Sequence, residues 1–143
     1  MWYDIFAMSS ENKFDMEMFF SALSDRTRLR LLNLMQQDEL CVCYFPEIIG
    51  TNQPKISRHL AYLRKAGLVS VRREWKWAHY RIVEPTNERA AKVLREVLEW
   101  LKEDEEMQRD QLKLMNLCCV PVQQQPISIQ GAPRPLRLEN QTA

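Results

Sequence analysis

Apolar residues recur at helical spacing through the first third of the chain. The stretch MEMFFSALSD predicts a short amphipathic helix that ends at its last two residues. Asp25 can cap the next helix, which the apolar residues of RTRLRLLNLMQQ predict. A third, short helix is expected around 46–49, because a proline suits a first helical turn and Gly50 can end it.

The fourth predicted helix, residues 53–66, separates its polar and apolar sides clearly. Ile56, Leu60 and Leu63 recur at positions i, i+4 and i+7 and form a buried stripe. Asn52 can cap the first turn, which contains a proline. The opposite side is polar and is therefore available to solvent or to a binding partner.

A β-hairpin and a long helix are expected next. LVSVRR and WAHYRIV alternate as two short strands joined by a charged turn near 74–76. Residues 87–117 contain no Pro or Gly and keep a helical apolar spacing, which predicts one continuous helix of roughly 45 Å. So long a helix exceeds what a small core can cover, and we expect its surplus apolar side to meet a second copy of the chain.

The end of the chain has a different composition. After Cys119 it is rich in Pro and Gln without helical periodicity, which is typical of disorder. We therefore divide the chain into a domain at residues 1–117 and a segment at 118–143 that holds a Cys-Cys pair and a disordered tail. The sequence shows neither a membrane-spanning apolar run nor a secretion signal, so we expect a cytoplasmic protein with no membrane partner.

Positive charge is concentrated in residues 51–82. This stretch holds eight Lys or Arg residues and a single acidic residue, Glu74, whereas the whole chain has a net charge of only +1. A local excess of this kind favours a polyanionic partner.

The order of helix, short turn, helix and arginine-bearing hairpin predicts a winged helix-turn-helix, in a mainly α fold with a small β-hairpin. The helix at 53–66 would enter the major groove of a double-stranded DNA operator, and the hairpin would lie against the backbone or a minor groove. A homodimer formed through the first and last helices would bind an inverted repeat. The predicted DNA-binding residues are Gln53, Lys55, Ser57, Arg58, Tyr62, Lys65, Arg72, Arg73 and Lys76.

Two motifs, ELCVCYFPEI and QPKISRHLAYLRKAGLVSVRREWKWAHYRI, closely resemble the ArsR/SmtB family of metalloregulatory transcriptional repressors, and its ArsR arsenical sensors in particular. The resemblance covers about residues 16–117. It implies a dimeric winged-helix repressor that holds its operator when free of metal and releases it when a metalloid binds. Family members usually carry Gly in the wing turn, where this chain has Trp75, and many continue the cysteine box as CVCxxC, where this chain has Pro46.

Two pairs of cysteines, Cys41 with Cys43 and Cys118 with Cys119, are the candidate metalloid ligands. In a reducing cytosol such pairs indicate thiol chemistry or metal binding rather than a disulfide framework. Thiolates without a nearby His select a soft ion, and As(III) or Sb(III) suits them as inducer. Cys41 and Cys43 lie about 200° apart on a regular helix, so the backbone there must be irregular or extended for both to bind one ion.

Three ligand arrangements remain open. Cys41 and Cys43 could act with one of the later pair, from the same or the other subunit. Cys118 and Cys119 could form the core of a separate site. A two-sulfur site would favour a singly methylated or aryl arsenical. Zinc sensing is disfavoured, because it needs Asp and His ligands along the long helix and the only histidines, His59 and His79, lie elsewhere as expected structural residues.

Other functions compete with a metalloid-responsive repressor. The cysteines could form a disulfide in a redox-sensing repressor, or the domain could be a winged-helix interaction module that does not bind DNA or a protein that buffers metalloid. An enzyme is not expected, since the chain has no phosphate-cradling Gly loop and no nucleophile with an evident base. No catalytic cofactor is expected either.

Overall fold

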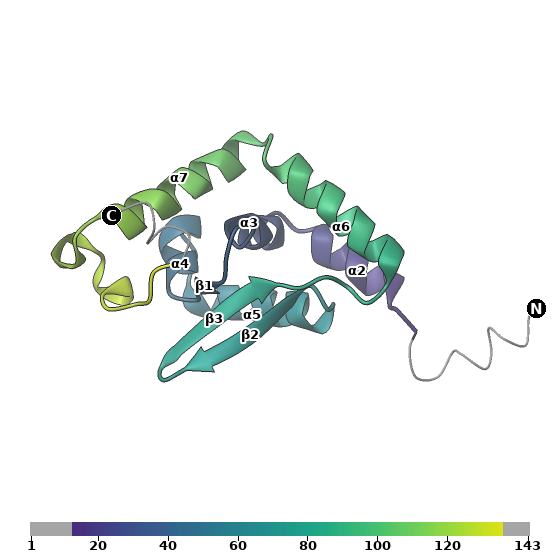
Figure 1. Ribbon diagram of the computed structural model, residues 1–143, viewed down its shortest axis with the longest axis horizontal. Helices are drawn as coiled ribbons and strands as arrows, with labels where there is room; N and C mark the ends of the chain where they lie inside the picture. The colour runs from purple at the N-terminus through teal and green to yellow at the C-terminus, as the bar shows by residue number, and fades with distance from the viewer. Residues whose placement is uncertain (1–12, 136–143) are drawn as a thin grey trace, which may run out of the picture.

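The computed structural model describes residues 13–135, and residues 1–12 and 136–143 lie outside this part. It is mostly helical with a small antiparallel sheet, as predicted (Figure 1). The main elements are α2 (Met16–Leu23), α3 (Arg26–Leu34), β1 (Leu40–Cys41), α4 (Tyr44–Ile49), α5 (Gln53–Lys65), β2 (Val69–Glu74), β3 (Trp77–Ile82), α6 (Glu88–Leu101) and α7 (Glu105–Cys119).

Side-chain caps set where the helices begin. The Asp25 carboxylate accepts a hydrogen bond from the Arg28 backbone N–H at 3.0 Å, and the Asn52 side chain accepts one from Lys55 at the same distance. These two caps confirm the predicted starts of α3 and α5. Gly50 ends α4 with φ +80°, a left-handed conformation that glycine adopts without a steric penalty. The chain therefore turns tightly between α4 and α5.

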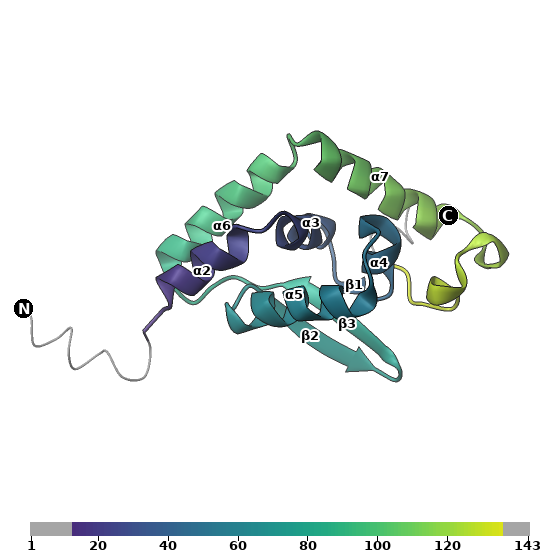
Figure 2. The same cartoon turned by 180° about the vertical axis from the view of Figure 1, so that it is seen from behind.

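The sheet joins the hairpin to a strand that the sequence did not reveal. Its strand order is β1-β3-β2. Cys41 of β1 pairs with His79 of β3, and His79 pairs in turn with Arg72 of β2. The hairpin turn places Trp75 at φ +55°, where other family members were expected to have glycine. In Figures 1 and 2 the hairpin extends away from the helices as a wing.

The prediction of one helix over residues 87–117 is wrong. The chain bends between α6 and α7 at residues 102–104, and Asp104 caps the new helix by accepting a hydrogen bond from the Met107 backbone N–H. Arg26 fixes the bend with ion pairs to Asp104 at 2.7 Å and to Glu106 at 2.8 Å. The bend lets α7 pack on α3 and α4 of its own chain (Figure 1). The surplus apolar surface is therefore smaller than a straight helix would leave.

Two further boundaries differ from expectation. The short third helix begins at Tyr44, two residues before the proline. Cys118 lies within α7 and is buried in the core, and the following segment forms two 3₁₀ turns up to Ile129, which is fully buried. The separation of residues 118–143 as a disordered tail stays a prediction beyond residue 135. Within the described part, no helix is long and apolar enough to cross a membrane.

Candidate nucleic-acid interface and thiol site

The polar side of α5 faces solvent. Ile56, Leu60 and Leu63 are fully buried, as predicted, and they fix the rotation of the helix on the core. Of the six predicted DNA-binding residues on α5, Tyr62 alone is half-buried. The Arg28 guanidinium lies 4.5 Å from the centre of the Tyr62 ring. The exposed ones are Gln53, Lys55, Ser57, Arg58 and Lys65.

The same Arg28 explains the position of His59. Its guanidinium lies 3.2 Å from His59 Nδ1, and it also donates to the backbone carbonyl oxygens of Ala22 and Ser21. His59 is thus held at the contact between α2, α3 and α5, which agrees with a structural role.

The predicted DNA-binding residues of the wing differ in whether an acidic side chain neutralises their charge. Arg73 and Lys76 are exposed, and the Lys76 ammonium lies about 5 Å from the Trp75 and Trp77 rings. Arg72 instead forms ion pairs with Glu39 at 2.5 Å and with Glu74 at 2.9 Å. Hydrogen bonding from Arg72 lowers the pKa of Glu39, so this carboxylate stays charged at neutral pH. The positive charge of Arg72 is therefore balanced by two carboxylates and is less available to a DNA phosphate.

Cys41 and Cys43 meet where β1 gives way to α4. Their Sγ atoms are 3.0 Å apart. Cys41 has the extended backbone of the strand, and Cys43 is the N-cap residue of α4. The two side chains therefore do not point in opposite directions, as they would on a regular helix. The irregular backbone predicted for this box is confirmed.

The contact polarises the two thiols in opposite directions. The hydrogen bond from the Cys43 thiol lowers the pKa of Cys41 to about 7, against the effect of burial. The same hydrogen bond, together with burial, raises the pKa of Cys43. One thiolate and one thiol therefore share the site near neutral pH, and a thiolate is the form that reacts with soft electrophiles.

The second cysteine pair is divided between the core and the surface. Cys118 is 1% exposed and shares the core with Cys41 and Tyr44, whereas Cys119 is exposed. Burial raises the pKa of Cys118 to about 11, and the Tyr44 hydroxyl partly offsets this rise. Among residues 13–135, no three His, Cys, Asp or Glu side chains converge as a ligand set for a metal. Cys118 and Cys119 thus lie in different surroundings, one in the core and one at the surface.

Comparisons with known proteins identify the family. The model of "Bacterial regulatory protein, arsR family" matches residues 25–71. The chain is 43% identical over 90 residues to the arsenical resistance operon repressor of Escherichia coli (strain K12), covering 62% of this chain and 75% of the relative. The chain belongs to the arsR family. This family consists of DNA-binding transcriptional regulators rather than enzymes.

Two further relatives agree with this assignment. The arsenic resistance transcriptional regulator ArsR1 of Pseudomonas putida is 40% identical over 90 residues, covering 59% of this chain and 70% of the relative. The crystal structure of the transcriptional repressor BigR from Xylella fastidiosa superposes with a TM-score of 0.54 at 27% identity, covering 73% of this chain and 97% of that one. The arsR-type winged-helix fold is thus supported by both sequence and structure.

Sequence reasoning missed the positions of three residues of this arsR-family chain that surround the thiols and the wing, although it expected His79 to be structural. Glu39 binds Arg72, His79 lies buried between Cys41 and Arg72 in the sheet, and Tyr44 places its hydroxyl near Cys118. Only the position of Tyr44 directly after the cysteine box gave any signal in the sequence. The positions of Glu39 and His79 relative to the thiols depend on the pairing of β1 with β3, which no local pattern predicted.

Proposed function

We propose that this protein is a homodimeric transcriptional repressor that binds an inverted-repeat operator and releases it when As(III) or Sb(III) binds to the Cys41 and Cys43 thiolates. The observation that carries the proposal is the 3.0 Å contact between these two sulfurs directly before α4. Sulfur ligands select soft ions, and one ion can bind both atoms. The names of the Escherichia coli and Pseudomonas putida relatives support an arsenical as inducer.

The exposed face of α5 supports binding in the major groove. Ser57 and Arg58 lie near its N-terminal half, where a recognition helix contacts base edges, and Arg58 suits a guanine. Lys55 and Lys65 would bind phosphates, together with Arg73 and Lys76 of the wing. Because these contacts are ionic, affinity should fall steeply as salt rises.

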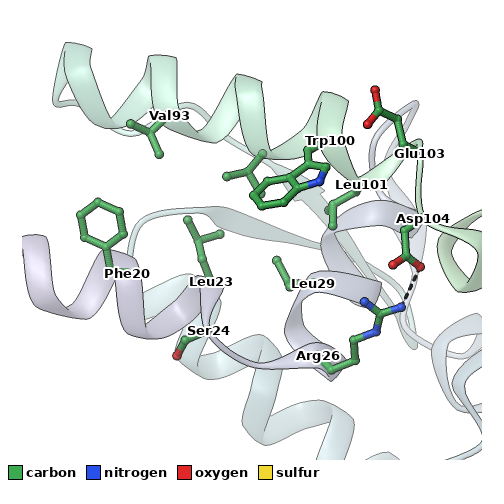
Figure 3. Close-up of a pocket in the computed structure, with 11 residues that line it drawn as sticks. Phe20, Leu23, Ser24, Arg26, Leu29, Val93, Trp100, Leu101, Glu103 and Asp104 are labelled. Atoms are coloured by element: carbon green, nitrogen blue, oxygen red, sulfur yellow. Dashed lines mark hydrogen bonds and ion pairs between the residues drawn. The ribbon is translucent and has the colours of Figure 1, made fainter.

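An apolar groove between α2 and α6 supports the homodimer. The groove has a volume of about 750 Å³, and the side chains of Phe20, Leu23, Val93 and Trp100 lie along it (Figure 3). Phe20 is 51% exposed and Trp100 73% exposed, which is unusual for aromatic side chains of their size. A second copy would cover both faces around a two-fold axis and place two α5 helices on one operator.

Two connections lead from the thiols to the DNA-binding surface. α4 begins at Tyr44, directly after Cys43, and packs on α5. On the other side, Cys41 pairs with His79, and His79 pairs with Arg72 of the wing. An ion that pulls the two sulfurs into its own coordination geometry would shift α4 and the wing. The spacing of the two α5 helices in the dimer would then change.

The test is operator release by arsenite from the fully reduced protein. A duplex selected from an inverted-repeat library serves as operator in a gel shift without oxidant. Wild type is expected to release it, whereas Cys41→Ser and Cys43→Ser are expected to stay bound.

Arg58→Ala should weaken binding by about 1–3 kcal/mol, with Arg64→Ala on another side of α5 as its control. Release that requires an oxidant would favour redox sensing instead, and absence of any sequence preference would exclude a repressor.

A further inference from the structure

We propose that Trp75, at the tip of the wing, determines part of the operator sequence: its indole ring enters the minor groove at the outer flank of each half-site and selects A·T base pairs there. The proposal rests on the proposed function and adds one residue that sets its specificity. Trp75 lies in the turn between β2 and β3, at the end of the hairpin that points away from the helices (Figures 1 and 2).

The Trp75 ring is not part of the hydrophobic core. It is 85% exposed, although an indole is one of the largest apolar side chains. Its backbone has φ +55°, in the left-handed region that side chains other than glycine seldom occupy and that stores strain when they do. A glycine would fit this turn without strain and without exposing an apolar ring. Trp75 therefore stabilises nothing in the free protein, and we expect its ring to act on a partner.

The charges around the tip favour a nucleic acid as that partner. Lys76 Nζ lies 4.8 Å from the centre of the Trp75 ring and 5.0 Å from that of Trp77, so a cation is held beside the exposed indole. Arg73 is also exposed, whereas the Glu74 carboxylate is paired with Arg72 at 2.9 Å. An apolar ring flanked by positive charge suits a minor groove, where base edges lie between two phosphate chains.

The position of the wing places this contact at the outside of each half-site. β2 packs on α5, so the tip is held relative to the helix that would enter the major groove. In both views the tip lies at the opposite end of the molecule from α2 and α6, which would face the two-fold axis of the dimer (Figures 1 and 2). The two tips would therefore lie beyond the two α5 helices, over the flanks of the inverted repeat.

The chemistry of the indole explains the preference for A·T pairs. Its N–H is a donor without acceptor capacity. In the minor groove A·T pairs present only the acceptors adenine N3 and thymine O2, whereas a G·C pair adds the guanine N2 amino group, a second donor that also projects into the groove. The indole should therefore bind at A·T pairs and be excluded by G·C pairs.

The experiment compares duplexes that share one inverted repeat and differ at one flanking base pair, taken at each flanking position in turn. The pairs are A·T, G·C and inosine·C, because inosine lacks the N2 amino group and keeps the major-groove atoms of guanine. At the position that Trp75 contacts, wild type should bind the G·C duplex about tenfold more weakly than the A·T duplex. The inosine·C duplex should bind like A·T. Equal losses with G·C and inosine·C, or no loss at any flank, would overturn the proposal.

Trp75→Gly and Trp75→Asn remove the ring and suit a positive φ. Both should bind the A·T duplex about tenfold more weakly than wild type and no longer distinguish it from G·C. Trp75→Phe should keep part of the preference, because its ring still meets the guanine amino group. Ile127→Ala is the matched control, since Ile127 is an apolar residue 89% exposed outside the wing, and it should behave like wild type. Urea denaturation should show no loss of stability in Trp75→Gly, unlike the replacement of a structural residue.

A Trp75→Gly protein that keeps the wild-type preference for A·T would also overturn the proposal. The proposed function would still stand if that protein selects the inverted repeat and releases it with arsenite. If wild type itself neither selects an inverted repeat nor releases it with arsenite, the proposed function fails.

Discussion

Cys41 is a buried thiol that is nevertheless acidic. The hydrogen bond from Cys43 lowers its pKa to about 7, because the donated proton stabilises the thiolate. Near neutral pH a large fraction of Cys41 is therefore ready to attack an electrophile, while Cys43 still carries its proton. We expect the metalloid to bond to Cys41 first and then to displace the proton from Cys43.

Replacing Cys43 by Ala should raise the pKa of Cys41, since the thiol hydrogen bond that lowers it disappears and burial remains. Thiolate absorbance in the ultraviolet, followed against pH, checks this. The wild-type step near pH 7 should be absent in Cys41→Ser and should move upward in Cys43→Ala. Cys119→Ser is the control and should keep it. An unchanged midpoint in Cys43→Ala would show that the hydrogen bond is not the cause.

At the scale of secondary structure, the wing is held to the sheet by Arg72. Its guanidinium forms ion pairs with Glu39, just before β1, and with Glu74 of its own strand. These partners compensate a charge that the sequence had assigned to DNA. Glu39 lies two residues before Cys41, so a movement at the thiols would also change how Arg72 is held.

Glu39→Gln should leave Arg72 paired with Glu74 only and make its guanidinium more available to a phosphate. We expect tighter operator binding and a salt dependence steeper by about one unit in the slope of log K against log [salt]. Gel shifts at several salt concentrations measure both. Glu84→Gln removes the same charge from an exposed pair with Arg95 outside the wing and is the matched control. Equal effects of the two substitutions would indicate a general charge effect instead.

A second element contact joins α3 to α7. Arg30 donates to both carboxylate oxygens of Asp110, at 2.7 and 2.9 Å, and the Asp110 side chain is 1% exposed. The Arg30–Asp110 pair lies between α3 and α7, which come into contact because the chain bends after α6. Removing one partner of a buried pair leaves the other without compensation.

Asp110→Asn should lower the free energy of unfolding by about 3–5 kcal/mol. Urea denaturation monitored by circular dichroism measures this change. Glu105→Gln serves as control, because Glu105 faces Arg109 at 4.0 Å with both side chains exposed, and such pairs contribute about 0–1 kcal/mol. Similar small losses in both variants would mean that the Arg30–Asp110 pair does not stabilise α7.

For the whole molecule, we propose the groove between α2 and α6 as the dimer interface. Phe20 of α2 and Trp100 of α6 are exposed along it, and Leu29 of α3 and residues 103–104 of the bend also line it. Because α7 turns away to pack on α3 and α4, the proposed dimer contact is shorter than a continuous last helix would give.

Trp100→Glu should convert the proposed dimer into a monomer. The substitution would place a carboxylate in the interface, where burial of its charge would oppose association. Operator affinity should fall by about 10²–10⁴-fold, since simultaneous contact with both half-sites is lost. Analytical ultracentrifugation and gel shifts measure the two effects. Leu112→Glu places the same charge on an exposed apolar residue of α7 outside the groove and should leave both unchanged. A dimeric Trp100→Glu protein would contradict this interface.

The sequence by itself determined the local features of this protein. The Asp25 and Asn52 caps and the buried stripe of α5 each depend on residues within about two turns of one another, and they were predicted correctly. Only the tertiary structure decided the bend after α6, the partner of Arg72 and the burial of Cys118. These depend on contacts across long stretches of chain, 33 residues for Arg72 with Glu39 and 80 for Arg30 with Asp110, which no periodic pattern encodes.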